Sequence, residues 1–152
     1  MQANDFTKDD YFSASINRFE DFKHLRTNQK SIIFTLYCAG VSTECMFRAY
    51  ILNETKEFDS KHDLYKLFIK SKMMLRMSES EREQLSLSVK RISDFWFNNL
   101  RYTSDKRAKR KIAHKLVQRT NFKDINKYLE KQNIDIFEAT EKIIEIGKNK
   151  WT

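Results

Sequence analysis

The chain has 152 residues, of which 33% are charged, and its net charge at pH 7 is +8. This length suits one domain with a buried core and is too short for two. The sequence contains no proline and only two glycines, Gly40 and Gly147. A β-rich fold needs many tight turns, and therefore many of these residues, so we expect a single all-α domain over residues 1–152. Twelve phenylalanines are enough to fill its core and argue against global disorder.

The first two predicted helices lie in the N-terminal third of the chain. Thr7 and Asp10 resemble a capping box, and the apolar spacing that follows predicts a helix over residues 8–26. We expect Asn28 to start the second helix, whose stretch from 32 to 52 is apolar on nearly all sides. Such a helix packs at the centre of a bundle. Its small residues at 39 and 40 predict a close approach by another backbone.

The central helix carries a charged pair and two cysteines. Glu44 and Arg48 are one turn apart and can pair. Because a buried carboxylate is costly unless paired and hydrogen-bonded, we expect a second partner for Glu44, either Arg101 or His62. The two cysteines, seven residues apart, are separated by roughly 10.5 Å along a helix, which is too far for a disulfide. They are expected to be free thiols of a cytoplasmic protein.

The remaining chain predicts five more helices. Ser60 and Asp63 can cap a short helix, and Ser78 with Glu81 can start a long helix that runs to about residue 102. Ser104 then opens a basic helix. Two further short helices follow, over the segments NFKDINKYLEKQ and IDIFEATEKIIEIGKNKW, the second of them capped by Asp135 with Glu138. These elements predict an up-and-down bundle with short connections.

Five short motifs follow one another along the chain: Ala39-Gly40, Glu44, Arg48-Ala49, His62-Asp63-Leu64 and Arg101-Tyr102. Their order resembles the HEPN superfamily (higher eukaryotes and prokaryotes nucleotide-binding domain). The resemblance covers residues 10–120 approximately and implies a bundle of four or five helices over about 8–120. Residues 121–152 lie outside the resemblance and are expected to form a helical extension. HEPN proteins usually dimerise, and many are metal-independent ribonucleases of toxin–antitoxin or antiviral defence systems. The resemblance therefore implies a homodimer that binds or cleaves RNA.

The basic segment over residues 101–119 holds eight Lys or Arg and one acid, so it carries +7 of the net charge. A local basic patch of this kind indicates a nucleic-acid contact, and a solvated helix face is the alternative. HEPN nucleases carry an Arg and a His with four to six residues between them; here Arg107 and His114 have six, although Ala108 departs from the polar residue usual in the family. The expected nucleic-acid contacts are Arg101, Tyr102, Lys106, Arg110, Lys111 and Lys115.

Metal-independent RNA cleavage needs proton transfer and a positive charge on the phosphorane. Histidine suits the former and arginine the latter, so His114 is the candidate acid or base, and Arg107 or Arg101 the candidate clamp. His114 as a plain surface residue stays open, as does a pairing of Arg101 with Glu44. His62 and Asp63 are expected to be structural, Asp63 as a helix cap and His62 turned toward the bundle.

Two other kinds of function remain open. The protein could be a non-catalytic module that pairs with a nucleotidyltransferase, an antitoxin or a larger defence complex, or a basic adaptor that only binds nucleic acid. The three histidines are scattered and show no ligand spacing with the cysteines, so we expect no metal and no cofactor. No apolar run reaches the length of a membrane helix, so no contact with a membrane is expected.

Overall fold

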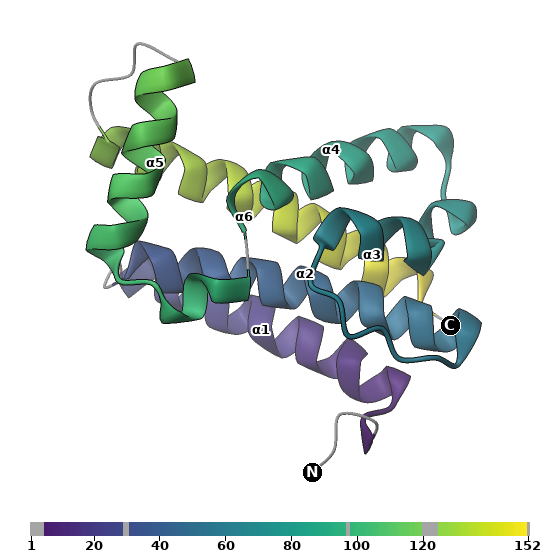
Figure 1. Ribbon diagram of the computed structural model, residues 1–152. Helices are drawn as coiled ribbons and strands as arrows, with labels where there is room; N and C mark the ends of the chain where they lie inside the picture. The colour runs from purple at the N-terminus through teal and green to yellow at the C-terminus, as the bar shows by residue number, and fades with distance from the viewer. Residues whose placement is uncertain (1–4, 29–30, 97, 120–124, 152) are drawn as a thin grey trace.

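The computed structural model describes residues 5–28, 31–96, 98–119 and 125–151, without the side chains at 28, 112 and 115–119. Within these ranges the chain forms α-helices and short 3₁₀ helices and contains no strand, which confirms the all-α prediction (Figure 1). No helix in this part of the chain is long and apolar enough to cross a membrane. The elements are α1 Lys8–Asn28, α2 Ile32–Thr55, α3 Leu64–Ser71, η2 Met73–Arg76, α4 Glu79–Phe95, η3 Asn98–Tyr102, α5 Asp105–Arg119 and α6 Ile125–Lys150.

Helix α2 is the centre of the bundle, as its apolar sequence predicts. It packs against α1, α3, α4 and α6, and residues on all of its sides are buried. Its N-cap is Ser31, whose hydroxyl oxygen accepts the backbone N–H of Phe34 at 3.2 Å. The predicted start at Asn28 is wrong, because Asn28 is the last residue of α1. The helix ends at Thr55, and its C-cap, Lys56, has the left-handed conformation with φ of 60°.

The small residue Gly40 admits an indole ring. A Cβ atom at Gly40 would lie 1.9 Å from Cδ1 of Trp96, so only glycine leaves room for the ring. The indole Nε1–H of Trp96 donates to the carbonyl of Tyr37 at 3.2 Å. The predicted close approach at Gly40 therefore involves a side chain of α4's C-terminal end and not a second backbone.

This docking of Trp96 also explains why α4 is shorter than predicted. The helix starts with the predicted capping box between Ser78 and Glu81, but it ends at Phe95 and does not continue to Tyr102. Trp96 has extended backbone angles, φ −92° and ψ 133°, and its ring lies against α2. The chain then re-forms as η3, which buries Leu100 in the core. Tertiary packing thus ends a helix that the local sequence would have continued.

The C-terminal segment forms one helix, α6, and not the two short helices predicted. Asp135 lies in its interior and caps nothing, because an apolar stripe of Leu129, Ile136 and Ile143 continues past it at seven-residue spacing. Helix α6 packs against α1, α2 and α4. Ile136, Ala139 and Ile143 of α6 join the hydrophobic core of the bundle. The division into a core over about 8–120 and a helical extension over 121–152 stays a prediction.

Candidate nucleic-acid interface

Helix α5 stands crosswise to α1 and α2 at one end of the bundle (Figure 1). The hydroxyl oxygen of Ser104 accepts the backbone N–H of Arg107 at 3.2 Å and so caps the helix. The hydroxyl of Ser31, at the start of α2, donates to the Asp105 carboxylate at 3.2 Å. One turn further, Ala108 is buried in the core. These contacts hold the N-terminal turn of α5 (its foot) against the bundle. They thereby determine which side of the helix faces outward.

The outward side of α5 presents three basic residues and a histidine on one face. At 3.6 residues per turn, Arg107, Arg110, Lys111 and His114 lie within an arc of about 100° that does not include Ala108. All four side chains are exposed. We call these four residues the basic face. The segment that contains it, residues 101–119, holds eight Lys or Arg and one acid, Asp105, whose carboxylate accepts the hydroxyl of Ser31.

The two residues predicted to be catalytic, Arg107 and His114, therefore share this face. They are two turns apart, which corresponds to roughly 10.5 Å along the helix axis. Of the other predicted contacts, Lys106 is exposed beside the basic face. The side chain of Lys115 lies outside the described part of the structure.

Arg101 and Tyr102 lie in η3, immediately before α5. Tyr102 is 73% exposed, and the guanidinium of Arg101 lies 4.5 Å from the centre of its ring. Leu100 beside them is buried, and Thr103 donates its hydroxyl to the carbonyl of Asn99 at 2.9 Å. The turn is thus anchored to the bundle while its Arg–Tyr pair faces solvent.

The charged pair of the central helix, Glu44 and Arg48, forms a buried network. Glu44 and Arg48 are only 8% and 6% exposed, and Arg48 Nη2 lies 2.6 Å from Glu44 Oε1. The second partner of the carboxylate is His62, whose Nδ1 lies 3.0 and 3.1 Å from the two oxygens. Arg101, the other candidate, is exposed in η3. The network therefore joins α2 to the connection that precedes α3.

The same connection is held by further contacts. Arg48 Nη2 donates to the carbonyl of Lys61 at 2.8 Å, and its guanidinium lies 5.0 Å from the ring centre of Phe58. Asp63 caps α3 by accepting the backbone N–H of Lys66 at 3.0 Å. The contacts of Arg48, His62 and Asp63 are thus of a structural kind: they shape the segment between α2 and α3.

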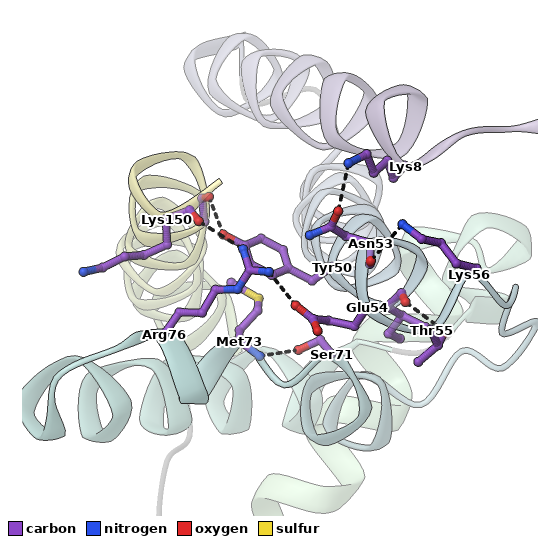
Figure 2. Close-up of polar contacts among 12 residues, drawn as sticks. Lys8, Tyr50, Asn53, Glu54, Thr55, Lys56, Ser71, Met73, Arg76 and Lys150 are labelled. Atoms are coloured by element: carbon purple, nitrogen blue, oxygen red, sulfur yellow. Dashed lines mark hydrogen bonds and ion pairs between the residues drawn. The ribbon is translucent and has the colours of Figure 1, made fainter. Parts of the chain in front are cut away.

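A second polar cluster, which the sequence did not reveal, anchors the end of α6 (Figure 2). Arg76 pairs with Glu54, and its guanidinium lies 5.4 Å from the ring centre of Tyr50. The Tyr50 hydroxyl donates to the carbonyl of Gly147 at 2.8 Å. Trp151 follows and stacks on Phe12 of α1, with ring centres 4.6 Å apart. Because these partners come from distant parts of the chain, no local motif signals them.

The interior also contains weakly acidic groups whose charged forms are disfavoured. Burial raises the pKa of Cys38 to about 11, and burial followed by the nearby Glu44 charge raises the pKa of Cys45 to about 12. Both cysteines are free thiols, as predicted from their spacing. They lie on α2, where Cys38 is buried and Cys45 is half-buried.

Comparisons of the chain with protein-family models, with curated proteins and with solved structures found no match. The resemblance to the HEPN superfamily accordingly remains a prediction based on the residues quoted above.

Proposed function

We propose that the protein binds RNA through the basic face of α5. The observation that supports this most directly is the exposure of Arg107, Arg110 and Lys111 on one side of a helix that is fixed at its foot. Phosphate groups recur at regular intervals along a nucleic acid, so a row of exposed cations on one face can neutralise several of them together. Arginine adds paired donors that match phosphate oxygens.

The choice of RNA among anionic partners is supported by the HEPN-like order of residues.

The simpler alternative to a binding site is a positive charge scattered over the surface, but residues 101–119 carry +7 of the total +8. The rest of the chain is thus almost neutral. Such a focused charge favours a polyanion over a small acidic metabolite.

A binding measurement with matched charge changes tests this proposal. The triple variant Arg107→Gln, Arg110→Gln, Lys111→Gln removes three charges from the basic face. The control, Lys66→Gln, Lys90→Gln, Lys148→Gln, removes three exposed charges from α3, α4 and α6. With a fluorescently labelled RNA of about twenty nucleotides, anisotropy should show roughly tenfold or greater loss of affinity for the first variant only. Equal losses for both variants, or none, would refute the assignment to α5.

Metal-independent cleavage of the bound RNA is a second candidate, supported by the shared exposed face of Arg107 and His114. In this candidate His114 transfers a proton and Arg107 stabilises the phosphorane, and a homodimer brings two such pairs together. The test is RNA cleavage in the presence of a chelator. His114→Ala should abolish it, whereas His24→Ala, which changes an exposed histidine on α1, should not. Cleavage that persists unchanged in His114→Ala would exclude this mechanism.

A further inference from the structure

Two exposed aromatic rings lie near the foot of α5. Tyr102 is 73% exposed and Phe34 is 48% exposed. Single exposed rings are common on protein surfaces and need no explanation. These two, however, come from η3 and from the first turn of α2, the two elements next to the start of the basic helix.

Their proximity to α5 follows from the contact between Ser31 and Asp105. Phe34 is three residues after Ser31, Tyr102 is three residues before Asp105, and the two side chains in contact are 3.2 Å apart. Three residues span no more than about 11 Å of chain. The backbone of Phe34 therefore lies within about 11 Å of Ser31, and the backbone of Tyr102 lies within about 11 Å of Asp105. The hydroxyl oxygen of Ser31, the N-cap of α2, also accepts the backbone N–H of Phe34 at 3.2 Å, which ties Phe34 to this contact.

Both rings rest on anchored neighbours. Phe34 stacks on Tyr37 with ring centres 6.1 Å apart, and Tyr37 stacks in turn on the buried Trp96 at 6.4 Å. Tyr102 is covered on one side by the Arg101 guanidinium and is held by η3, whose Leu100 is buried. A ring supported in this way can offer a flat surface to a partner at a small entropic cost.

We propose that Phe34 and Tyr102 stack on unpaired bases of single-stranded RNA whose phosphates lie along the basic face of α5. This inference rests on the proposed RNA binding and adds the form of RNA that is bound. Aromatic platforms beside a basic track are how proteins hold single strands, because every base has a face that can stack. The bases of a duplex are already stacked on one another, so a duplex can use only the cations.

The test compares a labelled single-stranded RNA with a duplex of the same sequence by anisotropy. Tyr102→Ala and Phe34→Ala should each weaken single-strand binding by roughly five- to tenfold, with little change for the duplex. Tyr102→Phe and Phe34→Tyr keep a ring and should retain the affinity. Tyr65→Ala is the matched control, since Tyr65 is 51% exposed but lies on α3, away from α5 (Figure 1).

The outcomes separate this inference from the function on which it rests. If the triple charge variant of the basic face loses affinity but both alanine variants bind single strands like the wild type, the stacking proposal is wrong and RNA binding stands. The stacking proposal is also wrong if the alanine variants lose single-strand and duplex binding equally. If the charge variant binds as tightly as the wild type, or the wild type binds no RNA, both proposals fail.

Discussion

Glu44 shows how a single buried residue constrains this fold. Its carboxylate is 8% exposed and lies within hydrogen-bond distance of Arg48 and His62. Removing one partner of a buried ion pair leaves the other charge without compensation. The intact pair therefore adds little to the free energy of unfolding, whereas the loss of one partner lowers that free energy strongly.

We expect Glu44→Ala to lower the free energy of unfolding by about 3–5 kcal/mol, because Arg48 stays buried without its counter-charge. His62→Ala should cost about 1 kcal/mol, since it removes one hydrogen bond at a half-exposed ring. Asp21→Ala, which breaks an exposed pair with Arg18, is the control and should cost at most about 1 kcal/mol. Urea unfolding measures all three. A loss for Glu44→Ala no larger than the control would contradict the buried network.

The raised pKa of Cys45 predicts that the stability of the folded chain falls as the pH rises above 9. Burial keeps Cys45 protonated in the folded chain up to a pKa of about 12, whereas the ordinary value is 9.0. The unfolded chain loses this proton first, so the folded state gains stability from Cys45 below pH 9, and that gain is lost between pH 9 and 12. At about pH 8, iodoacetamide should label the unfolded chain fully while the folded chain stays unlabelled by mass spectrometry. Labelling of folded Cys45 at the rate of the unfolded chain would disprove this account.

At the scale of elements, features set by neighbouring residues could be predicted from the sequence. Features that depend on residues far apart in the chain could not. The capping box of Ser78 and Glu81 formed as predicted, because both hydrogen bonds lie within one turn of chain. The end of α4 was mispredicted because it depends on Trp96 meeting Gly40, which is far away in the sequence. Likewise, Phe34 reads as one of the core residues of an all-round apolar helix, and only the fold shows that its ring is exposed.

The interior position of Asp135 gives a prediction that distinguishes one helix from two. Inside α6, replacing Asp135 with Ala should stabilise the protein by up to about 0.5 kcal/mol, because alanine is the better helix former. If Asp135 were an N-cap, the same change would destabilise by about 1 kcal/mol. Asp63→Ala removes a true cap, that of α3, and should show such a loss. A destabilised Asp135→Ala variant in thermal or urea unfolding would mean that α6 is interrupted.

At the scale of the whole molecule, the two ends of the bundle carry different groups of polar residues. The basic helix α5 stands at one end of the bundle, and the C-terminal end of α6, beside Arg76 and Tyr50, lies at the other (Figure 1, Figure 2). The basic segment was evident from the charge count alone. Which of its cations point outward depends on Ala108 and Asp105 holding the helix in place, and that required the structure.

The most direct test of RNA binding by α5 is the salt dependence of affinity. For single strands, the slope of log K against log salt concentration is about −0.7 for each phosphate neutralised. The triple variant Arg107→Gln, Arg110→Gln, Lys111→Gln should therefore have a slope smaller in magnitude by about 2 than the wild type. A slope that does not change in this variant would contradict the claim that the basic face of α5 contacts the RNA backbone.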